Sequence, residues 1–133
     1  MTTTRRHTGI VRTGQGDFAR WMELLAAQYA ALAGVELVPG TLNVELDEPW
    51  SMPAHALRLE PDPLLGTVRV FVAPCRIAGR SAFVLRTQAN EEDRGDHPRN
   101  LVEIAADVHL RSVLGLADGD RVEVELPDEA HER

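Results

Sequence analysis

Short strand-like segments, separated by turns, restrict the fold of this 133-residue chain more than any other feature. In residues 67–73, valines alternate with Arg69 and Phe71, which is the period-two pattern of a strand with one buried face. Few of the segments stand in βαβ order, so a small closed β-barrel is favoured over a doubly wound sheet. Closure also removes exposed strand edges. The other segments with strand character are residues 8–12, 42–46, 82–86, 101–105 and 121–126.

One long and one short helix complete the expected mainly β fold. The long helix is expected over residues 17–33, between Asp17 at its start and Gly34 as its stop. The short helix is expected from Asp107, as N-cap, through residue 114, with Gly115 as its stop. The stripe of the long helix that should face the barrel contains Phe18, Trp21, Leu25, Gln28, Tyr29 and Leu32.

Composition predicts a single domain with a core over about residues 8–126 and a charged tail over residues 127–133. No apolar run approaches the length of a membrane span, and the first residues lack the apolar segment of a secretory signal. A cytoplasmic protein without a membrane partner is therefore expected. Cys75 is the only cysteine, so a disulfide within the chain and a cysteine zinc site are excluded and burial as a small hydrophobe is expected.

The charged residues exclude several functions. A net charge of −7 argues against a nucleic-acid partner, which requires a basic face. All 14 cationic residues are arginine, so a lysine Schiff base and a phosphate loop of the Walker type are excluded. If the chain handles phosphate, then arginine, backbone amides and metal must do so.

A forced turn followed by two neutral oxygen ligands is the first candidate site. Thr41 and Asn43 follow Pro39-Gly40 and stand two residues apart, so in a strand their side chains point the same way. A hydroxyl and an amide carbonyl can hold one Mg²⁺ whose other positions go to water and phosphate. The alternative is that these side chains only close the turn with local hydrogen bonds.

Two further segments have the residue types of a phosphate site. Gly14-Gln15-Gly16-Asp17 joins the first strand to the long helix, where free amides favour an anion, although a tight turn capped by Asp17 explains the same residues. Arg111 lies in the first turns of the short helix, whose start can face a phosphate. A surface arginine beside a carboxylate is its ordinary explanation.

Glu103 is a carboxylate within an otherwise apolar strand. An inward-facing carboxylate needs a partner or a raised pKa, which suits a base or a ligand anchor. The strand can equally place this side chain in solvent. Residues 88–100 contain no apolar residue beyond Ala89 and are expected to form a mobile loop, in which His97 is the histidine of interest.

The order of these motifs resembles the CTP-dependent riboflavin kinases known from archaea. It is carried by Pro-Gly-Thr-Leu-Asn-Val at residues 39–44, Ala-Phe-Val-Leu-Arg-Thr at 82–87 and Val-Glu-Ile-Ala-Ala at 102–106, followed by Leu110-Arg111 and residues 114–120. The resemblance covers roughly residues 8–126. It implies a six-stranded cradle-loop (RIFT-related) β-barrel that transfers the γ-phosphoryl group of CTP to riboflavin, giving FMN and CDP.

The resemblance also implies roles for particular residues. Thr41 and Asn43 would bind Mg²⁺, Thr87 and Glu103 would contact the flavin, and Glu103 is the one candidate base. The implied nucleotide-binding residues are Gly14, Gln15, Gly16, Asp17, Val108, His109, Leu110 and Arg111.

Two other functions fit the same residues. A flavin- or nucleotide-binding regulatory module would have kept the barrel and lost catalysis, and a structural barrel of the swapped-hairpin kind would bind no ligand. Riboflavin binding without turnover would identify the regulatory module, and absence of any ligand would identify the structural barrel. A monomer or a small homo-oligomer is compatible with all three.

Overall fold

A computed structural model describes residues 3–14 and 18–129 of the chain. The strands and helices alternate little along the sequence, and the strands dominate, as the sequence predicts. The strands are β1 (Thr4–Arg12), β2 (Leu42–Leu46), β3 (Leu57–Leu59), β4 (Val70–Ile77), β5 (Arg80–Thr87), β6 (Leu101–Ala105) and β7 (Arg121–Pro127). The helices are α1 (Phe18–Leu24), α2 (Ala26–Ala33), α3 (Gln88–Glu91) and α4 (Leu110–Leu114).

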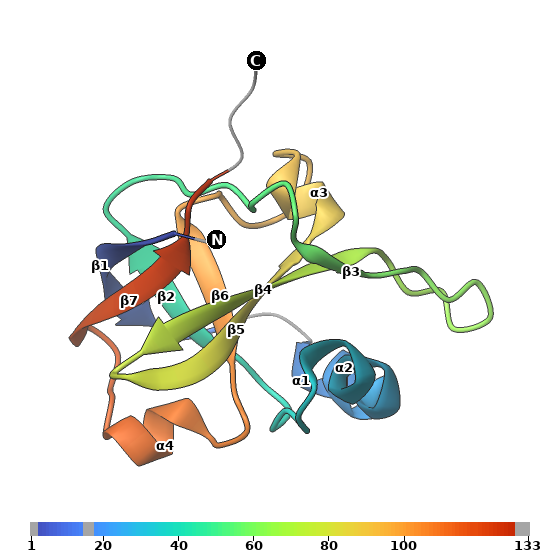
Figure 1. Cartoon of the computed structure of the whole chain (residues 1–133), viewed down its shortest axis with the longest axis horizontal. Coiled ribbons are helices and arrows are strands. Elements are labelled where there is room, and N and C mark those ends of the chain that lie inside the picture. Colours follow the sequence, from blue (N-terminus) through green and yellow to red (C-terminus); the bar gives the residue numbers. More distant parts are fainter. Residues whose placement is uncertain (1–2, 15–17, 130–133) are drawn as a thin grey trace.

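The sheet closes into an antiparallel barrel (Figure 1). Its strands follow the order β4-β5-β6-β2-β1-β7, and pairing of β4 with β7 closes the ring. The predicted six-stranded barrel is thereby confirmed, with β3 as an additional strand on the outer edge of β4. Side chains that alternate inward fill the barrel, as the period-two pattern requires, and Val11, Val44, Val84 and Ile104 are fully buried.

The helices lie outside the barrel. In Figure 1, α3 and α4 lie at opposite ends of it, and α1 and α2 lie together on one side, near the base of β3. Met22, Leu25 and Tyr29 of this helical segment pack with Val70 and Leu85 in a second apolar cluster. Among the described residues, no helix is both long enough and apolar enough to cross a membrane.

The prediction of one continuous helix over residues 17–33 is wrong. A break at Leu25, with φ −107° and ψ 27°, divides it into α1 and α2. The break lets the side chains on both sides of it pack into one cluster, where Met22 is buried in place of the exposed Gln28. Gly34 ends α2 in the left-handed conformation (φ 80°), as predicted, and Asp17 lies outside the described residues.

The short helix begins later than predicted. Asp107 is not its N-cap, because α4 starts after His109. The carbonyl of the buried Ala106 accepts a hydrogen bond from the Val38 amide at 2.8 Å, and the chain bends at residues 107–108 before the helix begins. Asp107 instead lies 3.9 Å from Arg80, and Gly115 (φ 64°) stops the helix as predicted.

The prediction of a mobile loop over residues 88–100 is wrong for the first residues of this segment. Residues 88–91 form α3, whose amide at Asn90 donates to the Thr87 hydroxyl at 3.1 Å. Such a cap satisfies one of the free amides of a helix start. The segment then continues with the buried Asn90 side chain accepting a hydrogen bond from the His97 amide at 3.3 Å. Polar groups therefore hold a segment that has almost no apolar residues.

Several strand ends also differ from the prediction: β1 begins at Thr4 rather than at residue 8, and β5 spans Arg80–Thr87 rather than residues 82–86. The strand expected over residues 67–73 runs from Val70 to Ile77 and passes through Pro74. Proline is tolerated there because the outer edge of β4 pairs with β3 only up to Val72 and with β7 only from Arg76. At the other end of the chain, the expected tail starts later, since the Asp128 amide donates to the Thr3 carbonyl at 3.0 Å.

Candidate functional site

Thr41, Asn43 and Glu103 bring three side-chain oxygens together on neighbouring strands. Asn43 and Glu103 face each other in the β2–β6 pairing, and Thr41 directly precedes β2. The Thr41 hydroxyl lies 3.1 Å from Asn43 Oδ1 and 3.3 Å from Glu103 Oε1. Asn43 and Glu103 are almost fully buried, with 2% and 5% of their surface exposed. The inward alternative for Glu103 is therefore the observed one.

This oxygen cluster fits a magnesium ion. The Thr41 hydroxyl has one proton for two acceptor oxygens, so the cluster holds more acceptors than donors. Two ligands at about 2.1 Å on adjacent corners of an octahedron are about 3.0 Å apart, close to the 3.1 Å between Thr41 and Asn43. The described residues contain no group of three or more histidine, cysteine, aspartate or glutamate side chains suited to a metal. A site here would therefore rest on neutral oxygens.

Gly14 brings the end of β1 against this cluster. A Cβ atom at Gly14 would lie 3.0 Å from Asn43 Nδ2 and 3.1 Å from Asn43 Oδ1. That is tighter than ordinary van der Waals contact, so glycine at this position lets the backbone approach the Asn43 amide. The other residues of the predicted phosphate turn, Gln15, Gly16 and Asp17, lie outside the described residues.

A cavity of about 640 Å³ opens on one side of Glu103. One wall is apolar and aromatic and comes from α1, α2, β4 and the segment before β4, and the other is polar and comes from β5, β6, α3 and the loop after α3. A pocket with apolar walls and a few polar groups is the usual form of a small-molecule site. Its apolar wall includes Phe18, Trp21, Leu25, Tyr29, Val68 and Val70, and its polar wall Thr87, Asn90, Asp96, His97 and Glu103.

Burial dominates the electrostatics of Glu103. Removal from water raises the pKa of this carboxyl, while nearby His97, the Thr41 hydrogen bond and Arg86 oppose the rise. A carboxylate with a raised pKa binds a proton more readily than one in water. Glu103 is thus placed to accept a proton from a group in the cavity.

A smaller cleft of about 80 Å³ lies on the other side of Thr41. It is lined by Gly40 and Thr41 together with the whole of the second predicted nucleotide-binding segment: Val108, His109, Leu110 and Arg111. Arg111 is held by Asp118 at 2.9 Å and donates to the Arg12 carbonyl at 3.3 Å. The guanidinium therefore ties α4 to the end of β1 near Gly14.

The predicted site residues that the structure describes thus lie around the contact between Thr41 and Glu103. Thr87 and Glu103 line the larger cavity, the 108–111 segment lines the smaller cleft, and Thr41 lines the cleft while contacting Glu103. Two ligands, one in each hollow, would meet at the oxygen cluster. Such a meeting point is what transfer of a group between two substrates needs.

Three residues around the larger cavity were missed by the sequence reasoning as functional residues. Arg86 is buried beneath the loop, Asn90 organises it, and the Tyr29 side chain enters the cavity. An arginine at a strand end and an asparagine in a polar segment give no sequence signal of burial. The sequence places Tyr29 in the inward stripe of the helix, as expected for a core residue. Only the cavity in the structure shows that this residue also lines a candidate site.

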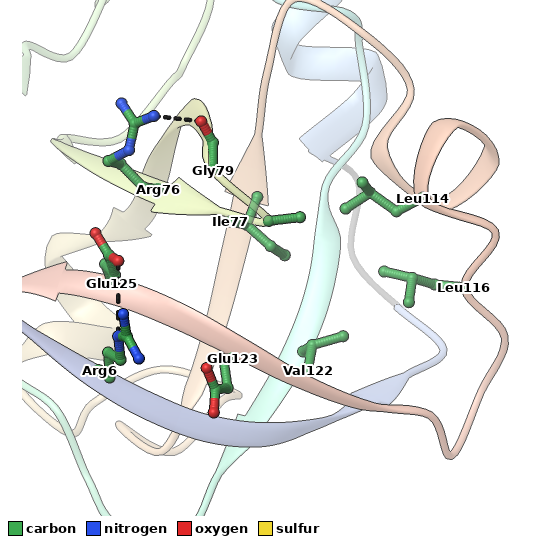
Figure 2. A pocket seen from close by; sticks show the side chains of 10 residues that line it. Arg6, Arg76, Ile77, Gly79, Leu114, Leu116, Val122, Glu123 and Glu125 are labelled. Carbon is green, nitrogen blue, oxygen red and sulfur yellow. Dashed lines mark hydrogen bonds and ion pairs between the residues drawn. The ribbon is translucent and has the colours of Figure 1, made fainter.

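Figure 2 shows a third hollow, of about 540 Å³, between the β4–β5 turn, β7 and the segment after α4. Both of its arginines already have partners within the chain: Arg6 lies 3.8 Å from Glu125, and Arg76 donates to the Gly79 carbonyl. None of the predicted site residues that the structure describes lines it. The larger cavity and the cleft are therefore the candidate site.

Tyr29 permits a test of this cavity, because it is the only tyrosine in the chain. Burial, and secondarily the charge of Glu103, raises the pKa of Tyr29 from 10.0 to about 12. The folded state thus binds more protons than the unfolded state between these values, so stability falls as the pH rises from about 10 to about 12. We expect the tyrosinate absorbance to appear near pH 12 in the folded protein and near pH 10 in urea. Coincident titrations would contradict the buried environment.

The chain matches one protein family over most of its length. A model of the CTP-dependent riboflavin kinase family, described as a domain of unknown function (DUF120), matches residues 11–126. The riboflavin kinase of Methanocella arvoryzae is 39% identical over 124 residues, which are 89% of this chain and 55% of that protein. This chain therefore spans about half the length of that relative.

Two other relatives are matched over nearly their whole length. The riboflavin kinase of Aeropyrum pernix is 31% identical over 129 residues, covering 90% of this chain and 94% of that protein. The riboflavin kinase of Staphylothermus marinus is 28% identical over 123 residues, covering 91% of each. The residues matched by the family model include all the residues that line the cavity and the cleft.

Proposed function

Because this chain belongs to the CTP-dependent riboflavin kinase family, we propose that it transfers the γ-phosphoryl group of CTP to riboflavin, giving FMN and CDP in a magnesium-dependent reaction. The observation that carries the proposal is the contact between Thr41 and Glu103, which joins the cavity to the cleft. The names of the relatives support riboflavin as the acceptor, and the name of the family supports CTP as the donor.

In this proposal riboflavin occupies the larger cavity. Its isoalloxazine ring packs against the aromatic and apolar wall that includes Trp21 and Val70. Its ribityl chain extends along the polar wall to Glu103, with Thr87 as a further contact. The size and mixed character of the cavity suit a ligand with an apolar ring system and a polyol chain.

The nucleotide occupies the cleft, with its phosphates directed toward the oxygen cluster. Arg111 and the backbone at Gly14 supply positive charge and close approach there. Thr41 and Asn43 would hold the Mg²⁺, which would supply positive charge to the phosphates when bound. Glu103 takes the proton of the ribityl 5′-hydroxyl as its oxygen bonds to the γ-phosphorus, and the bond to the β-phosphate oxygen breaks to release CDP.

The test is turnover by the purified chain. Riboflavin, CTP and Mg²⁺ together are expected to give FMN and CDP in equal amounts, separated by chromatography, and removal of Mg²⁺ with a chelator is expected to abolish the product. ATP, UTP and GTP serve as donor controls, because the cleft is small and phosphate contacts alone do not select a base. Riboflavin binding without FMN from any donor would instead identify an inactive flavin-binding module.

A further inference from the structure

The hydroxyl of Tyr29, a residue that lines the larger cavity, has no hydrogen-bond partner among the described residues. Tyr29 is in α2, has 2% of its surface exposed and lines the larger cavity. No hydrogen bond from its hydroxyl to any described residue is present, whereas the Trp50 indole N–H, also buried, donates to the Pro127 carbonyl at 3.0 Å. Most hydroxyls within folded proteins have a hydrogen-bond partner, so the lack of one at Tyr29 leaves its hydroxyl free to bond a ligand.

The hydroxyl is accessible from the cavity rather than sealed in the core. Among the described residues, the only fully enclosed side-chain oxygen or nitrogen atom without a hydrogen bond is Asp128 Oδ1. The Tyr29 oxygen therefore keeps some contact with open space, and the space that this residue lines is the cavity. A ligand there can supply the missing partner.

The surroundings make this hydroxyl a donor. Its raised pKa keeps the phenol protonated at every physiological pH, and Glu103, whose charge contributes to the rise, lines the same cavity. A phenol that donates and a carboxylate that accepts are complementary to an alcohol, which has one proton to give and lone pairs to receive. Ketones, ethers and alkyl groups lack one or both halves of that pattern.

We propose that the Tyr29 hydroxyl donates a hydrogen bond to a hydroxyl oxygen of the polyol chain of the bound flavin, making Tyr29 a specificity-determining residue for a polyhydroxylated ligand. The inference rests on the proposed function, because the riboflavin in the cavity supplies the polyol. Tyr29 positions the chain beside Glu103, while the flat ring system is held by the apolar wall.

Tyr29→Phe tests the proposal because it removes the hydroxyl and keeps the buried ring. Flavin fluorescence titrations with riboflavin and with lumiflavin, which has the same ring system and a methyl group in place of the polyol, separate the two parts of the ligand. The variant is expected to raise the Kd for riboflavin about 5- to 10-fold, the value of one neutral hydrogen bond. The Kd for lumiflavin is expected to stay unchanged.

Thermal unfolding of the variant without ligand provides the second readout. The melting temperature is expected not to fall, because no hydrogen bond to a described residue is lost. An unchanged Kd for riboflavin, or an equal loss for both flavins, would overturn the role of Tyr29 while leaving the kinase proposal intact. Failure of the unsubstituted protein to bind either flavin would overturn the proposed function and this inference with it.

Discussion

Asn43→Ala is expected to lower kcat/KM for FMN formation at least about 100-fold. The amide oxygen that it removes lies 3.1 Å from the Thr41 hydroxyl in a buried cluster and is one of the two proposed protein ligands of Mg²⁺. A metal contributes several kcal/mol to stabilising a phosphoryl group in transfer, and each 1.4 kcal/mol is about tenfold in rate. Rates measured over a range of Mg²⁺ concentrations check the prediction.

Matched variants separate loss of a ligand from loss of packing. Asn43→Asp keeps a ligand oxygen of the same length and is expected to retain Mg²⁺-dependent turnover above the alanine variant. Thr41→Ser keeps the hydroxyl and Thr41→Val removes it with little change of volume, so only the valine variant is expected to require more Mg²⁺. Wild-type rates in Asn43→Ala at limiting Mg²⁺ would remove the metal role assigned to this side chain.

Local signals in the sequence were sufficient for the barrel and for the residues around Thr41. The bounds of β2 and β6 agree with the predicted strands at residues 42–46 and 101–105. In both, apolar alternation and flanking turn residues determine the strand within a few positions. That β2 and β6 are neighbours, with Asn43 opposite Glu103, is a finding of the structure that the alternation alone does not predict.

Features that depend on distant parts of the chain could not be predicted in this way. The Leu25 break reflects how α1 and α2 pack on β3, β4 and β5, which no pattern within residues 17–33 reports. The late start of α4 follows a hydrogen bond to the Ala106 carbonyl from the amide of Val38, which is far away in sequence. The order of the loop after Thr87 likewise depends on a buried charge below it, at Arg86.

Arg86 holds both ends of that loop. It is 3% exposed, lies 2.9 Å from Glu91 of α3, and donates to the carbonyls of Arg99 at 2.9 Å and Leu101 at 3.2 Å. It also donates to the Trp50 carbonyl at 2.5 Å. The loop in turn supplies Asn90 and His97 to the wall of the cavity. The guanidinium thus shapes the larger cavity, the proposed riboflavin site, without lining it.

Arg86→Met is therefore expected to lower the free energy of unfolding by about 3 kcal/mol. Removing one partner of a buried ion pair costs about 3–5 kcal/mol because the other charge stays uncompensated. The lower end of this energy range applies because Glu91 keeps 19% of its side chain exposed and so retains some hydration. Three carbonyls lose a donor in addition, while methionine retains much of the packing volume against Trp50. Urea unfolding followed by tryptophan fluorescence measures the change.

Arg94→Met is the matched control, since it removes an arginine of the same loop whose partner, Glu92, is exposed. An exposed pair adds little to stability, so this variant is expected to unfold at nearly the same urea concentration as the unsubstituted protein. Because the loop forms the polar wall of the cavity, Arg86→Met is also expected to weaken riboflavin binding, and Arg94→Met is not. If the two variants lost equal stability, the loop would be held by its own backbone caps at Thr87 and Asn90, and the buried guanidinium would have no special part in building the site.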